Sequence, residues 1–459
     1  MASPVRNQYL EIKSRYQDAI LLYRMGDFYE TFDDDARVAA RDLEIVLTKR
    51  DMGQGEVVPL AGIPFHALDS YLAKLIRKGH RVAIAEQTSE PDGKRLVDRD
   101  VTRVVTSGTV IEPGLLESAS NNYLAAVAIS GAQAGIAHVD ISTGEFAVTQ
   151  LQTAVVGEEL ARLAPAEVLL LEGDASVPDD ALRFLNVNRL NGANFSASNA
   201  RRQLLDHFGV RSLDAYGCEG LELPTIAAAA IVEYLENTHK AVLPQIASLY
   251  TYSTTAFMTL DAQTRRNLEL FEGGRWGSRD QSLFSVLNLT ETAMGARQLR
   301  RWLGQPLLEL GALRRRLDAV EWMHVAETRR RLVRTELAGV SDIERTMQRV
   351  GAGVVLPREI VGLRHSLERV PKMREALSDA GDVIAWLWEE LDPCDSVVNF
   401  VTSAIADDPQ GEVGQGRVVR EGYSAEMDQV RSAARDARSY IAGLERKERD
   451  RTGIANLKV

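Results

Sequence analysis

The sequence predicts a multidomain chain in which two α/β domains precede a mostly α-helical domain. At 459 residues the chain is too long for a single hydrophobic core, and a prior of about 150 residues per domain suggests about three domains. Apolar residues alternate between strand and helix spacing up to about Leu243, and helical spacing dominates from there on. We therefore expect domains at residues 1–114, 122–245 and 246–445, a linker at 115–121, and the start of a further domain at 446–459.

The first domain begins with a helix, because Pro4 suits the first helical position and Val5, Tyr9 and Ile12 recur on one helical face. Asp33 or Asp34 can cap a second helix by accepting a backbone hydrogen bond. The other predicted elements, in order, are a strand at 20–25, a helix at 36–43, a strand at 45–48, a helix at 67–78, a strand at 81–86 and a loop at 89–100.

The run LLYRMGDFYE at residues 21–30 ends in an aromatic pair and a carboxylate. On an extended backbone residues two apart share a face, so Phe28 and Glu30 point the same way. One interpretation places Phe28 in the core and Glu30 at a solvated strand end, because most phenylalanines are core residues. The other makes Phe28 a wedge of the kind that is pushed between base steps to kink a duplex. A carboxylate beside such a wedge can accept a hydrogen bond from a base edge.

The segment RMGDFYE at residues 24–30 resembles the signature of the mismatch-recognition domain of the MutS family of DNA mismatch repair proteins. Further segments follow in that family's order: PLAGIPFHA at 59–67, VAIAEQ at 82–87 and RVVTSGT at 103–109. Two positions depart from the pattern, since Ala85 stands where many members have Cys and Ser107 where most have Pro. The resemblance implies that Phe28 stacks on a mispaired or unpaired base and that Glu30 hydrogen-bonds it. The partner would be double-stranded DNA with mismatches or small insertion or deletion loops, which the protein kinks.

The same resemblance places Lys49 and Arg50 near DNA. Two cations ahead of a glycine-containing loop suit contact with backbone phosphates, and an ordinary basic turn fits the sequence equally well. A first alternative function is that of a MutS-like homologue that binds DNA junctions, or of a stalled-translation factor with the same core. Such relatives lack the Phe-x-Glu pair that is present here.

The second domain opens with two apolar runs, NYLAAV at 122–127 and GIAHVDISTGEF at 135–146, which a glycine-containing turn separates and which indicate a hairpin. Helices at 158–163 and 228–235 and a buried strand at 167–171 follow. The resemblance implies the MutS connector domain, which has an RNase H-like shape without its chemistry. A metal nuclease is the second alternative, but two-metal hydrolysis needs several converging carboxylates, and Asp140 and Glu145 lack recognisable partners. We expect no catalytic and no metal-binding residues.

The third domain carries segments at 260–270, 292–303 and 342–345 that resemble the MutS core. A helix of about 28 residues at 423–450 is long enough for a lever, and 417–459 would fray because an amphipathic helix without a partner is only marginally stable. The resemblance implies an incomplete core and lever domain and the entrance to a clamp domain. No Gly-x-x-x-x-Gly-Lys-Ser/Thr loop occurs, so we expect no cofactor here, although the full-length family member is an ATPase that uses ATP and Mg. The family also implies a homodimer at full length and MutL as a partner.

The bulk properties are those of a soluble protein of a reducing compartment. The net charge of −11 argues superficially against DNA, but residues 116–245 hold 7 basic against 16 acidic side chains, whereas residues 1–115 hold 16 against 18. The basic excess at 431–459 is typical of a solvated helix face. Two cysteines, Cys218 and Cys394, make no disulfide framework and fit the cytoplasm. No stretch approaches the ~20 apolar residues that a membrane span needs.

Overall fold

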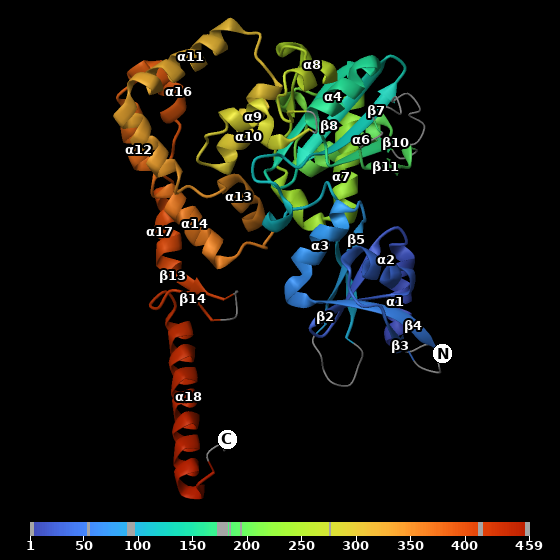
Figure 1. Cartoon of the computed structure of the whole chain (residues 1–459), viewed down its shortest axis with the longest axis vertical. Coiled ribbons are helices and arrows are strands. Elements are labelled where there is room, and N and C mark those ends of the chain that lie inside the picture. Colours follow the sequence, from blue (N-terminus) through green and yellow to red (C-terminus); the bar gives the residue numbers. More distant parts are fainter. Residues whose placement is uncertain are drawn as a thin grey trace. The chain divides into compact units, whose positions relative to one another are not determined.

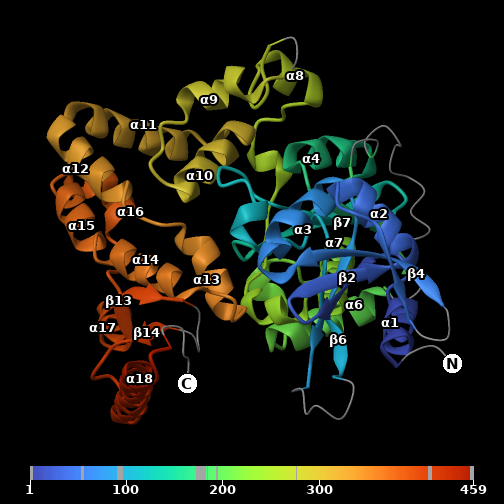
Figure 2. The ribbon, with the colours of Figure 1, turned by 60° about the horizontal axis from the view of Figure 1, so that its bottom comes forward.

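The structure is a computed structural model that describes residues 4–52, 56–89, 97–171, 182, 185–192, 195–274, 277–411 and 416–454. The chain divides into two compact units. The first contains Met1–Trp322 and Asp342–Val354, and the second contains Met323–Ser341 and Val355–Val459. Figures 1 and 2 show the elements of both units in two views.

The first unit begins with a six-stranded sheet that has helices on both faces (Figure 1). Its elements are α1 Pro4–Arg15, β1 Ile20–Met25, β2 Phe28–Phe32, α2 Asp33–Leu43, β3 Thr48–Asp51, β4 Val57–Pro64, α3 Leu68–Arg77, β5 Val82–Gln87 and β6 Arg99–Val105. The strand order is β3-β4-β2-β1-β5-β6, with β1 and β5 parallel and the other neighbours antiparallel. Helix α1 covers one face through Tyr9 and Ile12, while α2 and α3 cover the other through Leu43, Leu72 and Leu75.

Two details of the prediction for this sheet are wrong. No aspartate caps α2: Phe32 stands at the N-cap without a side-chain hydrogen bond, and Asp33 and Asp34 lie in the first turn, where the helix dipole favours negative charge. The strand expected at 45–48 is β3 at Thr48–Asp51, because Val46 is 77% exposed and pairing with β4 starts only at Thr48. The other elements lie within a few residues of their predicted positions, and most of the loop expected at 89–100 lies outside the described residues.

A second six-stranded sheet follows in the same unit. Its strands are β7 Leu124–Ser130, β8 Gln133–Asp140, β9 Glu145–Gln152, β10 Glu167–Leu171, β11 Val187–Leu190 and β12 Tyr250–Thr251, in the order β11-β10-β7-β8-β9-β12. Helices α6 Ala197–Phe208 and α7 Glu222–Thr238 cover one face and α4 Val156–Leu163 covers the other. The predicted hairpin is confirmed as β7–β8, but the run 135–146 is not one strand: it turns before Gly144, at φ +79°, and enters β9. β12 lies beyond the boundary expected at 245.

Helix α7 lies unusually close to the sheet because small residues face each other there. Ala227, Ala228, Ala229 and Ala230 are fully buried. On β8 a Cβ added to Gly135 would lie 2.2 Å from the backbone of Leu223 and Pro224. Glycine is therefore required at position 135 by the close approach of two backbones.

The rest of the chain is mostly helical, as predicted. The remaining helices and strands are α8 Ala262–Asn267, α9 Leu283–Leu287, α10 Ala293–Gly304, α11 Leu310–Val325, α12 Glu327–Leu337, α13 Ile343–Gly351, α14 Pro357–Leu367, α15 Val370–Ser378, α16 Ala385–Trp388, α17 Asp395–Ala404, β13 Ile405–Gln410, β14 Arg417–Val419 and α18 Ala425–Thr452. No described helix combines the length and the apolar character that crossing a bilayer requires.

Helix α18 confirms the long helix predicted at 423–450, shifted by two residues. Ser424 caps it by accepting a hydrogen bond from the Met427 amide, and Gly453 ends it at φ +68°. None of its residues is buried, and Tyr440 is 71% exposed. That this segment frays stays a prediction, and residues 455–459 lie outside the described part of the chain.

Candidate nucleic-acid interface

A two-residue turn between β1 and β2 places Phe28 at the tip of a hairpin. Met25 pairs with Phe28 across the strands, so Gly26 and Asp27 alone form the loop. Gly26 has φ +58°, and positive φ at the first of two loop residues is the type II′ arrangement that favours glycine. The Asp27 carbonyl accepts a 2.8 Å hydrogen bond from the Phe65 amide, which ties the tip to the end of β4.

The ring of Phe28 is on the surface rather than in the core. Phe28 is 46% exposed, whereas its neighbour Tyr29 is 1% exposed and packs in the core between the sheet and helices α2 and α3. Since alternate residues of a strand point to opposite faces, Phe28 belongs to the face that α1 covers further along the strands. The interpretation of Phe28 as a core residue is therefore wrong.

Glu30 lies on the same face as Phe28, and both side chains flank a position without a Cβ. Glu30 pairs with Gly62 across β4, and a Cβ built on Gly62 would lie 3.8 Å from Glu30 Cγ and 3.9 Å from Phe28 Cδ1. Burial raises the pKa of Glu30 above its usual value, even though the neighbouring Arg50 acts in the opposite direction. The two residues singled out in the sequence are thus brought together in one place.

Arg50 and Lys49 have different surroundings. The Arg50 guanidinium donates a 2.5 Å hydrogen bond to Glu30 Oε2, so this side chain, expected at a phosphate, pairs with the carboxylate of the site. Lys49 is exposed on β3 and points to the other face, because adjacent residues of a strand alternate. The sequence could not indicate the Arg50–Glu30 pair, because it depends on β3 and β2 lying on either side of β4.

Two residues that the sequence analysis did not single out brace the hairpin from behind. The Arg24 guanidinium lies 3.4 Å from the centre of the Phe65 ring and 5.3 Å from that of Tyr29, and its Nε donates a 2.5 Å hydrogen bond to the Gly26 carbonyl. Phe65 is 46% exposed, like Phe28, but contacts Tyr29 on the opposite face. This stack packs against the turn from the face opposite Phe28.

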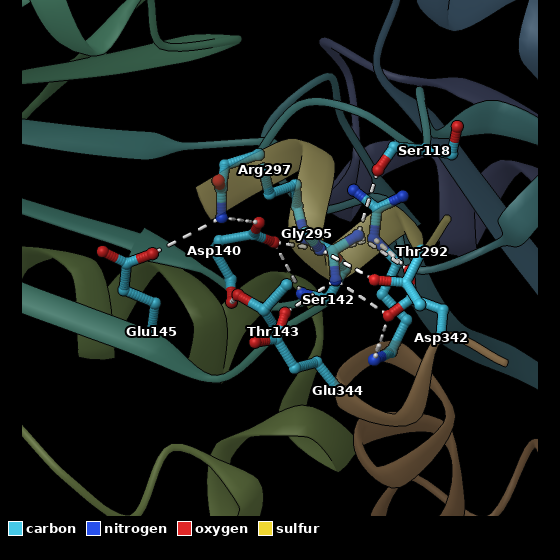
Figure 3. A network of polar contacts seen from close by, with 12 residues as sticks. Ser118, Asp140, Ser142, Thr143, Glu145, Thr292, Gly295, Arg297, Asp342 and Glu344 are labelled. Carbon is cyan, nitrogen blue, oxygen red and sulfur yellow. Dashed lines mark hydrogen bonds and ion pairs between the residues drawn. The ribbon is translucent and has the colours of Figure 1, made fainter. Parts of the chain in front are cut away.

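The carboxylates considered for a nuclease are saturated by protein donors (Figure 3). Asp140 is fully buried and accepts hydrogen bonds from the Asn122 amide, at 3.2 Å, and from the Ser142 hydroxyl, at 2.6 Å. Glu145 accepts from Tyr250 at 2.8 Å and from Arg301 at 2.6 Å. Among the described residues no cluster of His, Cys, Asp and Glu could hold a metal ion. In the structure both carboxylates are therefore engaged by donors of the protein itself.

The same network fixes the linker at 115–121. Arg297 on α10 is 3% exposed, forms a two-point ion pair with Asp342 at 2.7 and 2.8 Å, and donates to the Ser118 carbonyl (Figure 3). Arg345 on α13 donates to the carbonyls of Glu117 and Ser120 at 2.9 and 2.8 Å. The sequence analysis named segments 292–303 and 342–345 only for their resemblance to the family's core, so this function of the two arginines was missed.

Comparison with known proteins covers nearly the whole chain. Family models described as MutS domain I, MutS domain II and MutS domain III match residues 3–113, 122–247 and 263–449. The chain is 43% identical over all its residues to the DNA mismatch repair protein MutS of Dehalococcoides mccartyi strain CBDB1 and covers 53% of that protein. It is 45% identical to the MutS of Symbiobacterium thermophilum, of which it covers 54%. The chain thus spans about half the length of the curated relatives it matches. It belongs to the MutS family and contains the family's domains I, II and III.

Proposed function

We propose that this chain recognises mispaired or unpaired bases in double-stranded DNA, as part of DNA mismatch repair. The observation that carries the proposal is the 46% exposed ring of Phe28 at the tip of a braced hairpin, with Glu30 beside it. An aromatic ring that is exposed at the tip of a hairpin has a free face for stacking. The flat ring of a base is a suitable partner for such a face. The names of the relatives, DNA mismatch repair protein MutS, support the same role.

Phe28 would act as a wedge. Inserting an apolar ring between base steps unstacks them and kinks the duplex, at a cost of a few kcal/mol per step. A mispaired or unpaired base has already lost part of its pairing, so the same insertion costs less there. The wedge would therefore insert preferentially at base steps that open at low cost. The support from Arg24 and Phe65 keeps the Phe28 ring from folding back onto the protein.

Glu30 would hydrogen-bond the displaced base. Near phosphates a carboxylate is repelled, and the 2.5 Å contact with Arg50 offsets part of that repulsion. The carboxylate has a second oxygen that can accept from a base edge while Arg50 holds the first. Lys49, exposed on β3, which β4 separates from the strand of Glu30, is the residue we assign to backbone phosphate.

The ATP and Mg of the full-length family member belong to a different site. We infer that they bind outside these 459 residues, which contain no phosphate-binding loop of the Walker type. We infer from the family that ATP coupling, dimerisation and MutL binding involve the whole protein, and that it works in the cytoplasm. We also propose a mismatch-recognition domain at 1–114, an RNase H-like connector at 122–245, a core and lever domain at 246–445 and the clamp entrance at 446–459, with β12 at Tyr250–Thr251 completing the connector sheet beyond residue 245.

The experiment is a fluorescence-anisotropy titration of the chain with four labelled DNAs: a duplex with one G·T pair, a duplex with one unpaired T, the matched homoduplex, and a four-way junction. We expect tighter binding to the first two. Phe400→Ala is the control for Phe28→Ala, because the Phe400 ring is also exposed, at 62%, but lies on α17 outside the first sheet. Preference for the junction that does not depend on Phe28 would favour the junction-binding alternative and reject the proposal.

A further inference from the structure

A cavity of about 390 Å³ in the first unit has an unusually basic wall. It lies between the residues just before β7, the end of α4, helix α8 and helix α10. Its described lining includes seven arginines and two glutamates, Glu117 and Glu272. This excess of arginine over glutamate is unusual, because positive and negative side chains are interspersed on an ordinary protein surface.

Helix α10 supplies one side of the wall. Arg297, Arg300 and Arg301 are three and four residues apart and therefore share one helical face. Gly304, one turn further, lets the opposite side approach: a Cβ there would lie 3.7 Å from an Arg265 guanidinium nitrogen and 3.6 Å from the Phe271 ring. The arginines of α8 and α10 thus meet across a short distance.

Four of the seven arginines have carboxylate partners. These pairs are Arg162–Glu159, Arg279–Glu117, Arg297–Asp342 and Arg301–Glu145.

The other three arginines have no carboxylate within ion-pair distance in the described structure. Arg265 donates to the carbonyls of Leu260 and Gly304 at 2.9 and 3.0 Å, and Arg300 lies 4.3 Å from the centre of the Phe271 ring. Arg266 is exposed, and within the described part of the chain its guanidinium has no hydrogen-bond or ion-pair partner. Burial lowers the pKa of Arg265 and of Arg300, and the neighbouring Arg162 and Arg279 lower them further, while Glu159 acts in the opposite direction on Arg265 and Glu117 and Glu272 do so on Arg300. The wall therefore holds three arginines that form no ion pair of their own in the described structure.

We propose that this cavity binds a small anion with a diphosphate group. The planar guanidinium fork matches two phosphate oxygens at once, and several forks around one cavity suit a group with adjacent phosphates. The volume lies within the usual range of small-ligand sites. The site is separate from the hairpin of Phe28, since none of the described residues that line the cavity belongs to the first sheet.

The test is isothermal titration calorimetry of the whole chain with sodium pyrophosphate at low salt, and with ADP in a second arm. We expect one saturable site that weakens about ten-fold or more in Arg300→Gln and in Arg266→Gln, as the loss of a charged hydrogen bond does. Arg266→Gln keeps the test valid if Arg300→Gln unfolds, because the Arg266 side chain supports no contact in the described structure. Arg202→Gln, an exposed arginine of α6 outside the cavity, should leave the affinity unchanged.

The two arms distinguish the sources of the diphosphate. Equal affinity for pyrophosphate and ADP assigns the site to the diphosphate group alone, and tighter binding of ADP assigns it to a nucleoside diphosphate. Absence of saturable binding, or equal weakening in Arg202→Gln, would overturn the proposal. Since no DNA is present, such a failure leaves the proposed mismatch recognition untouched.

Discussion

Replacing Phe28 by alanine separates a wedge from a packing residue. Truncating a fully buried phenylalanine costs about 3–5 kcal/mol. Because Phe28 is 46% exposed and is the first residue of β2, we expect a loss of roughly 1 kcal/mol, which shifts the melting temperature by about 4–6 °C in a domain of residues 1–114. Stacking of a base on an aromatic ring contributes about 1–3 kcal/mol, so affinity for mismatched DNA should fall about 5- to 150-fold.

The assay pairs a thermal melt with the anisotropy titration described above, read as the ratio of affinities for G·T duplex and homoduplex. The ratio should approach one in Phe28→Ala, while affinity for homoduplex changes little, because a wedge acts only where a step opens.

Tyr29→Ala shows how far the melting temperature falls when a core residue is truncated. Tyr29 is 1% exposed and its hydroxyl hydrogen-bonds Glu86, so its truncation should cost several kcal/mol. If Phe28→Ala lowers the melting temperature as much as Tyr29→Ala and leaves the affinity ratio intact, the wedge assignment is wrong.

Three further changes test other parts of the structure. Glu30→Gln should strengthen binding to homoduplex and reduce the difference in affinity between mismatched and matched DNA, because a charge that phosphates repel is removed. Unchanged homoduplex affinity at low salt would count against this role. Gly135→Ala should lower the free energy of unfolding by about 1–3 kcal/mol, because the new Cβ would overlap the α7 backbone, whereas Gly114→Ala, where nothing lies within 4 Å, should be near neutral in chemical denaturation. Burial lowers the pKa of His138 to about 3 and that of His239 to about 4. Below pH ~6.5 the unfolded chain therefore binds protons that the folded chain does not. From pH 6.5 towards 4, each of the two histidines should lower the free energy of unfolding by about 1 kcal/mol per pH unit. His138→Phe should flatten that slope and exposed His66→Gln should not; equal slopes in both would refute the assignment.

The sequence was sufficient for features that depend on local spacing. Phe28 and Glu30 could be placed on one face because strand periodicity is two, and α18 could be predicted because helical spacing persists over 28 residues. The start of β3 could not be predicted, because Val46 and Leu47 are apolar yet exposed and pattern alone reads them as strand. Pairing across β4 decides the register instead.

Features that depend on tertiary contacts were out of reach. The Arg50–Glu30 ion pair joins strands separated by a third, and the arginines that hold the linker reach Ser118 and Glu117 from helices about 180 and 230 residues away. The requirement for Gly135 likewise follows from α7, more than 80 residues later in the chain. In each case the feature depends on which helices and strands become neighbours in the fold, and the residue types alone do not indicate it.

The central claim is that Phe28 enters the duplex at a mismatch, and the fluorescence of 2-aminopurine tests it most directly. This base is quenched when stacked, so it is placed next to a G·T pair in one duplex and at the same position in a matched duplex. We predict that the chain raises the fluorescence of the mismatched duplex only, that Phe400→Ala retains the rise and that Phe28→Ala abolishes it. An equal rise with Phe28→Ala, or the same rise in the matched duplex, would contradict the account.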